Sequence, residues 1–291
     1  MSTTLSFNNT KALTATGVKT FTVNDRIAVI YINSSGNTLK AESEPLTASN
    51  ITDGGKSATI SVILTSPKAG KVEYVYPASI ALEDGSVNDI ALMNNQKGTL
   101  ADIASNYDYR KGLGSLSING EFYELSSGNL DNQLFIASFT IEDGSQSIND
   151  SITDFTIEDG TYTYSISRSV SSDPIWLAMH PISGSQFIHV TAGTSSDRYE
   201  KTLFGKTLLS GFLYNVSVVA SKVVGTGSLD GINWSMSTGG ILTISGHSGI
   251  PDFNKEGSYP TINDRPWLSW KNDLREIFVL KGVTRIGNRA F

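Results

Sequence analysis

The chain has 291 residues, a net charge of −6, no cysteine and only 17% charged side chains. Because one hydrophobic core seldom serves much more than about 250 residues, this length predicts about two domains. The acidic charge argues against a nucleic-acid partner, which needs a basic face, and against an anionic membrane surface. The lack of cysteine excludes disulfides and thiolate metal sites within the chain.

The amino-terminal residues carry neither the basic nor the apolar region of an export signal. No run of about 18 apolar residues occurs, so no transmembrane helix is expected. We therefore expect either an intracellular protein or a mature form that has lost its leader.

The dominant hydrophobic period is two residues, which is typical of β-strands. Residues 20–32 predict a strand, a turn at Asn24-Asp25 and a second, apolar strand. Only residues 99–107 and 266–274 suggest helices. Short strands separated by Gly, Asn, Asp and Ser clusters predict an all-β sandwich architecture. The other expected strands are 58–64, 71–76, 133–141, 161–167, 175–179, 187–191, 200–204 and 214–221.

Three segments share an apolar-Glu-Asp-Gly pattern, at residues 82–85, 141–144 and 157–160. Their acidic pairs could be calcium ligands, but a calcium loop needs several carboxylates at spaced positions, which these segments lack. Asp-Gly also supplies the positive-φ residues of a tight hairpin turn. We therefore interpret the three segments as turns.

The sequence contains no recognisable catalytic or metal-binding pattern. The three histidines, His180, His189 and His247, have no neighbouring His or acidic residue at metal-ligand spacing. Neither a Gly-x-Ser-x-Gly elbow nor a phosphate-binding glycine loop is present. We expect no enzyme, no cofactor and no metal, although two converging glycosidase carboxylates would leave no sequence signature.

Several aromatic residues fall on the expected strands. They could form a sugar-stacking platform, but half-buried strand aromatics in a core are the commoner arrangement and the interpretation we favour. These residues are Tyr74, Tyr76, Tyr107, Tyr109, Phe135, Tyr162 and Tyr164.

Two changes in composition suggest domain boundaries. Residues 109–114 separate a tyrosine-rich region from the next group of strands, and residues 223–228 resemble a linker. Three of the four tryptophans, Trp234, Trp267 and Trp270, follow that linker. We predict an N-terminal sandwich over 1–112, a second sandwich over 113–223, and an appendage over 224–291.

The order of several short motifs resembles the Bacteroidales fimbrillins, the type V pilin-like proteins. Residues 5–7, 10–12 and 20–27 resemble the opening of that family. Val75-Tyr76-Pro77 and residues 95–109 resemble its middle, and residues 130–139, 175–181 and 205–216 resemble strands of its C-terminal domain. The motifs follow one another in family order over about 220 residues.

The last segment resembles a different family. Residues 234–246 and the closing residues 277–291, which end in Gly-Val-Thr-Arg-Ile-Gly-Asn-Arg-Ala-Phe, resemble the start of a BspA-type leucine-rich repeat. Only one repeat is visible, whereas about three are usually needed to bury a continuous core. We expect either a truncated repeat array or a small cap.

The resemblance implies two tandem transthyretin-like β-sandwich domains plus a small leucine-rich-repeat-like appendage. It also implies an outer-membrane lipoprotein whose leader and lipid-bearing cysteine are removed, so that a lipid anchor belongs to the precursor only. In this family a protease cuts after a basic N-terminal residue, and a strand of the next subunit fills the resulting groove. The matching positions are Lys11 for cleavage, and Leu5 and Phe7 on the first strand.

Asp150-Ser151-Ile152 resembles the O-glycosylation acceptor of these bacteria, which makes Ser151 a candidate, although a plain turn serine is the favoured interpretation. The implied function is a cell-surface fimbrial subunit or adhesin of accessory or tip type. Its partners would be other pilin subunits, joined by strand addition, and a host or bacterial surface protein or glycan. The alternatives are a secreted carbohydrate-binding module or accessory protein of glycan use and, third, a glycosidase.

Overall fold

The structure is a computed structural model that describes residues 1–7, 20–89, 95–120, 122–253 and 265–291. Almost all regular structure is β, which confirms the all-β prediction. The chain forms two compact units, and each unit contains segments that are distant in sequence. Unit 1 comprises Met1–Phe139, Pro174–Ser183 and Thr207–Val216, and unit 2 comprises Thr140–Asp173, Gly184–Lys206 and Ser217–Phe291.

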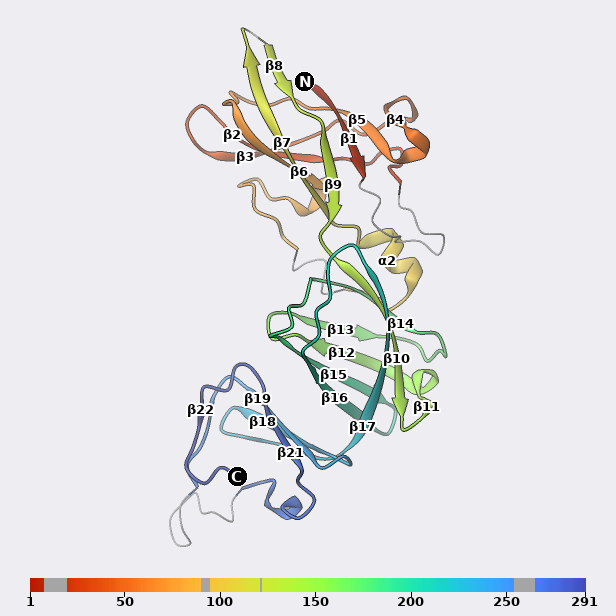
Figure 1. Ribbon diagram of the computed structural model, residues 1–291, viewed down its shortest axis with the longest axis vertical. Coiled ribbons are helices and arrows are strands. Elements are labelled where there is room, and N and C mark those ends of the chain that lie inside the picture. The colour runs from red at the N-terminus through yellow and green to blue at the C-terminus, as the bar shows by residue number, and fades with distance from the viewer. Residues whose placement is uncertain (8–19, 90–94, 121, 254–264) are drawn as a thin grey trace. The chain divides into compact units, whose positions relative to one another are not determined.

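Unit 1 contains a nine-stranded sheet in the order β3-β2-β6-β7-β9-β1-β5-β4, with β8 paired to β7 (Figure 1). Buried residues from both ends of this order, such as Val29 and Ile60, belong to one hydrophobic cluster, so the sheet curls around a single core. The strands are β1 (Ser2–Phe7), β2 (Ala28–Ile32), β3 (Thr38–Glu42), β4 (Ile51–Thr52), β5 (Ser57–Ser61), β6 (Gly70–Tyr76), β7 (Arg110–Asn119), β8 (Phe122–Leu125) and β9 (Gly128–Asn132).

A second sheet of eleven strands has the main order β13-β12-β15-β16-β17-β18-β19-β21. Off this path, β10 pairs with β11, β14 and β17. The strands are β10 (Phe135–Asp143), β11 (Gln146–Ser147), β12 (Ile152–Glu158), β13 (Thr163–Ser167), β14 (Ile175–Met179), β15 (Phe187–Thr194), β16 (Arg198–Phe204), β17 (Leu213–Leu229), β18 (Ile232–Ser237), β19 (Ile241–Gly246) and β21 (Glu276–Val279).

The two faces of β12, β15 and β16 differ in composition because successive side chains of a strand point to opposite faces. On one face Phe155, Ile157 and Val190 are buried in an apolar core. The opposite face carries His189 and Glu200, which are also buried, at 7% and 4% exposure. A polar face that is buried must be covered by other parts of the unit.

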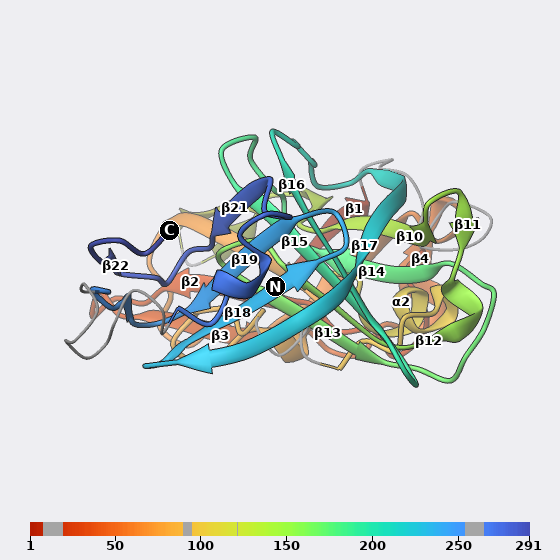
Figure 2. The ribbon, with the colours of Figure 1, turned by 90° about the horizontal axis from the view of Figure 1, so that it is seen from below.

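The C-terminal part of unit 2 has its own hydrophobic cluster, which includes Trp234, Trp267, Ile244 and Phe253. Figure 2 shows β17, β18, β19 and β21 side by side in this part. β21 pairs with β19 in parallel, and β22 (Arg285–Ile286) pairs in parallel with β20 (Gly249–Ile250). The tryptophans that follow the linker-like segment therefore build a core.

Short helices complete the described chain. The one α-helix among the described residues is α2 (Leu100–Asn106), which agrees with the predicted helix at 99–107. Thr99 caps it, because its side chain accepts a hydrogen bond from the Asp102 backbone N–H. Single 3-10 turns are η1 (Ala48–Asn50), η2 (Asp53–Gly55), η3 (Ala78–Ile80), η4 (Asn149–Ser151) and η6 (Leu268–Trp270).

The three apolar-Glu-Asp-Gly segments are turns, as predicted. Their glycines, Gly85, Gly144 and Gly160, have φ values of 80°, 64° and 83°, in the region that favours glycine. Asp159 accepts hydrogen bonds from the backbone N–H groups of Thr161 and Tyr162, so its carboxylate stabilises the turn.

Two predicted elements differ from the structure. The first half of residues 20–32 is irregular, because the Asp25 carboxylate accepts hydrogen bonds from the Thr22 backbone N–H and hydroxyl and holds the chain in a turn. Residues 266–274 form only the short η6 turn. Trp267 there lies in the core and donates its indole N–H to Ala290 O at 2.9 Å.

The predicted division into three parts remains a prediction. Residue 112, the first predicted boundary, lies inside β7, and the first sheet continues to Asn132. Among the described residues, no helix is long and apolar enough to cross a membrane.

Candidate functional site

The first strand of the chain lies in the interior of the unit 1 sheet. β1 pairs with β5 in antiparallel register, Leu5 opposite Ala58, and with β9 in parallel register, Leu5 opposite Gly128. Figure 1 shows β1 at the start of the chain, beside β5 and β9. A strand paired on both edges satisfies its own backbone groups and those of both neighbours.

Polar side chains fix the register of β1 on its outer face. The hydroxyls of Thr4 and Thr59 lie 3.3 Å apart, and those of Ser6 and Ser57 lie 2.8 Å apart. Cross-strand hydroxyl pairs of this kind add a few tenths of a kcal/mol, up to about 1, to the pairing. A slip of one residue would turn Leu5 to solvent and break both pairs.

The inner face of β1 is buried over a tyrosine. Leu5 has no exposed surface, and Thr3 is 8% exposed. Beneath them, Tyr74 donates its hydroxyl to Ser126 O at 2.7 Å. Burial raises the pKa of Tyr74 to about 12, and hydrogen bonds with Thr3 and Ser126 partly oppose that shift.

Two glycines make room for the Tyr74 ring. A Cβ at Gly114 would lie 2.6 Å from a ring carbon of Tyr74, and one at Gly128 would lie 3.0 Å away. Glycine within a strand is a sign of such a close approach. These two strand glycines are the sequence signal for the packing beneath β1.

β1 links two parts of the sheet. In the strand order it is the connection between β9 and β5. Without it, β5 and β9 would each have an unpaired edge, and the place that Leu5 fills in the core would be open. Such a slot can accept another strand, which would bond to both edges and insert alternate side chains.

The structure describes three of the four site residues that the sequence predicts. Leu5 is buried on β1, and Phe7 is the last residue of that strand, opposite Leu130 of β9 in the register. Lys11 lies outside the described residues. Ser151 ends the η4 turn in an exposed position, and its hydroxyl lies 3.0 Å from the Asp150 carboxylate.

Most of the aromatic residues considered for a sugar platform are buried, which confirms the core interpretation for them. Tyr162 is only partly buried. No group of three or more His, Asp or Glu side chains suited to a metal ion occurs in the part of the chain that the structure describes. The buried members of the set are Tyr74, Tyr76, Tyr107, Tyr109, Phe135 and Tyr164.

The sequence matches no protein-family model and no curated protein. Among solved structures, the chain is similar to a fimbrial assembly protein from Parabacteroides distasonis, with 12% identity and a TM-score of 0.41. That match covers 84% of this chain and 98% of the other. A fimbrial protein from Bacteroides ovatus matches with 14% identity and a TM-score of 0.34, over 75% of this chain and 47% of the other. Identities and TM-scores this low leave the function to be argued from the features of this chain.

Proposed function

We propose that this chain is a fimbrillin-like subunit or adhesin of the bacterial cell surface. It assembles with other pilin subunits by strand addition after proteolysis of its N-terminal segment. The precursor is an outer-membrane lipoprotein, and the chain belongs to a fimbrium. The motif order along the sequence motivates this proposal, and the position of β1 carries it.

The position of β1 fits a removable strand in three respects. It is the first strand of the chain, so one cut after it releases it from the rest. It is paired on both edges, so its loss exposes two rows of backbone groups. Its inner face contributes the fully buried Leu5, so its loss also exposes apolar surface. A strand from another subunit would cover both the exposed backbone groups and the exposed apolar surface.

We propose that residues 224–291 form a coil of the leucine-rich-repeat type attached to the second sandwich. The support is the pair of parallel ladders, Ile241 with Glu276 and Gly249 with Arg285. The paired residues are 35 and 36 positions apart, so the chain returns once to the same side of a coil, over a longer stretch than the roughly 20–29 residues of one leucine-rich repeat. A folded coil after the pilin part favours an accessory or tip subunit over a repeated stalk subunit.

Limited trypsin digestion tests the assembly. Cleavage at Lys11 or Lys19 separates β1 from the remainder, and we expect the cleaved protein to form oligomers in light scattering and filaments or short chains in electron micrographs. A synthetic peptide of residues 1–7, added in excess, should refill the slot and suppress assembly.

The matched control is the triple variant Lys11→Gln, Lys19→Gln, Arg26→Gln, which removes the three trypsin sites between β1 and β2 and should stay monomeric under the same digestion. The proposal fails if mass spectrometry shows that β1 has been released while the folded remainder stays monomeric at all concentrations.

A further inference from the structure

A large polar cleft lies within unit 2, on the face of the sheet opposite its apolar core. Its volume is about 820 Å³, within the range of about 300–1,000 Å³ typical of ligand sites. One wall is the outer face of β12, β15 and β16, and the other is formed by β17, β18 and β19. The cleft therefore separates strands β12, β15 and β16 from the C-terminal part of the unit.

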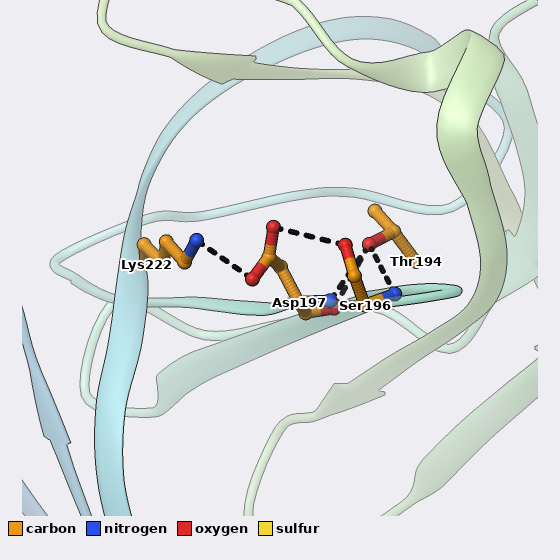
Figure 3. A network of polar contacts seen from close by, with 4 residues as sticks. All are labelled: Thr194, Ser196, Asp197 and Lys222. Atoms are coloured by element: carbon orange, nitrogen blue, oxygen red, sulfur yellow. Dashed lines mark hydrogen bonds and ion pairs between the residues drawn. The ribbon is translucent and has the colours of Figure 1, made fainter.

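The cleft exists because β17 changes partners along its length. It pairs with β16 at Lys222 and Ser221, and from Val223 onward it pairs with β18, with an irregularity between Val223 and Gly225. Figure 3 shows how the branch point is fixed: Lys222 Nζ lies 2.6 Å from an Asp197 carboxylate oxygen, and Asp197 bonds to Ser196 and Thr194. Beyond this network the edge of β17 that faced β16 lines the cleft.

A buried carboxylate lies in the cleft lining. Glu200 accepts hydrogen bonds from the hydroxyl of Ser235 at 2.6 Å and from that of Thr243 at 3.4 Å. A carboxylate has about four acceptor positions, so these two bonds leave capacity for further donors. Burial raises the pKa of Glu200, as expected of a carboxyl withdrawn from water.

The opposite wall offers a hydrogen-bond donor. Asn233 lines the cleft in an exposed position, and its amide oxygen accepts a hydrogen bond from the Ser228 hydroxyl at 2.7 Å. The amide nitrogen of Asn233 can donate to a ligand. Trp234 points to the other face of β18, where it packs against Trp267 and its indole nitrogen is buried beside Gly227.

The lining restricts the chemistry of a ligand. Three acids, Glu158, Asp197 and Glu200, outnumber the one cationic side chain of the lining, Arg198, which disfavours phosphate, sulfate or an anionic sugar. Serine, threonine and asparagine side chains dominate the rest, which disfavours a lipid. A neutral ligand rich in hydroxyl groups both donates to carboxylates and accepts from an amide N–H, so it matches both walls.

We propose that this cleft binds a short neutral oligosaccharide, with Glu200 accepting from sugar hydroxyls and the Asn233 amide nitrogen donating to one. The proposal is independent of strand-addition assembly, because β1 contributes nothing to the cleft. It gives the adhesin a ligand class and a location for its binding site.

The test is an array of neutral mannose-, glucose-, galactose- and fucose-based oligosaccharides probed with the full chain, followed by calorimetry on the hits. Glu200→Gln keeps the shape and removes the charge, and we expect the affinity to fall about 10- to 100-fold. Asn233→Asp keeps the shape and removes the donor, and we expect the affinity to fall about 10-fold.

The matched control is Glu142→Gln, because Glu142 also accepts a hydrogen bond from a serine hydroxyl, that of Ser217 at 2.6 Å, and does not line the cleft. That variant should keep its affinity. The proposal is overturned if the folded protein binds no neutral oligosaccharide at millimolar concentration, if only acidic glycans bind, or if neither cleft variant changes the affinity. Assembly after trypsin can fail or succeed without altering these outcomes.

Discussion

At the scale of single residues, His189 links the polar face of unit 2 to stability. Its Nδ1 lies 2.9 Å from the Thr202 hydroxyl, and the ring is 7% exposed. Burial, aided by the positive charge of Arg198, lowers the pKa of His189 from 6.5 to about 4. The folded protein therefore keeps this ring neutral at a pH where the unfolded chain protonates it.

The sign of the effect on stability follows from that difference. Between about pH 6.5 and 4 the unfolded chain binds more protons at this position than the folded protein, so the free energy of unfolding falls as the pH falls. A shift of this size corresponds to about 3 kcal/mol, fully present above pH 6.5 and lost as the pH falls through 4. Glu200, whose pKa is raised by burial, acts in the opposite direction, because its protonation favours the folded state.

We therefore predict that His189→Gln reduces the loss of stability on acidification. Glutamine can keep a hydrogen bond to Thr202 but cannot take up the proton. Between pH 7 and pH 4, wild type should lose about 3 kcal/mol more free energy of unfolding than the variant, measured by urea denaturation. The comparison between the two proteins cancels the contribution of Glu200. Equal losses of free energy of unfolding in wild type and variant would contradict the assignment of this pH dependence to His189.

At the scale of elements, local pattern predicted the strands that carry their own hydrophobic alternation. β14 matches its predicted range of 175–179, and β6 at Gly70–Tyr76 differs from its prediction by one residue. β9, with the sequence Gly-Asn-Leu-Asp-Asn, was not predicted, because four of its five residues are typical of turns. It becomes a strand through its pairing with β1 and β7, which no local signal encodes.

Local sequence also does not reveal which distant strands surround the candidate sites. Leu5 could be placed on a first strand from its alternation with polar neighbours, but its neighbours β5 and β9 come from distant parts of the sequence. Glu200 and Asn233 carry no local signal of a site. Their proximity to one cleft depends on the change of partner along β17, which is a tertiary feature.

The contribution of β1 to stability gives a prediction for this element. Leu5→Ala removes a fully buried side chain and should lower the free energy of unfolding by about 2–4 kcal/mol. The matched control is Thr4→Ala on the exposed face of the same strand, which loses only a hydroxyl contact with Thr59 and should change stability by about 0.5 kcal/mol or less. Urea denaturation measures both. Equal effects would mean that β1 does not fill the core as its burial indicates.

At the scale of the whole molecule, the compact units do not follow the order of the chain. Unit 2 combines strands from the middle of the sequence with the C-terminal part, and hydrogen bonds from Ser235 and Thr243 to Glu200 join the two. The segment at 223–228, which resembles a linker in sequence, lies within β17 and pairs with β18. Its glycines accommodate indole rings, since a Cβ at Gly225 would lie 2.5 Å from Trp270 and one at Gly227 would lie 2.7 Å from Trp234.

This organisation predicts that the C-terminal part stabilises the strands it covers. A chain ending at Lys222 would expose the face that holds His189 and Glu200, while keeping the Lys222–Asp197 ion pair. With water restored around the ring, the pKa of His189 should return toward 6.5, which NMR titration of the imidazole can follow. An unchanged low pKa of His189 in the shortened chain would contradict this prediction, because the burial of His189 would then arise without the C-terminal part. An independent appendage would leave the histidine unaffected, whereas a covering layer shifts its pKa by more than one unit, so the titration distinguishes the two arrangements.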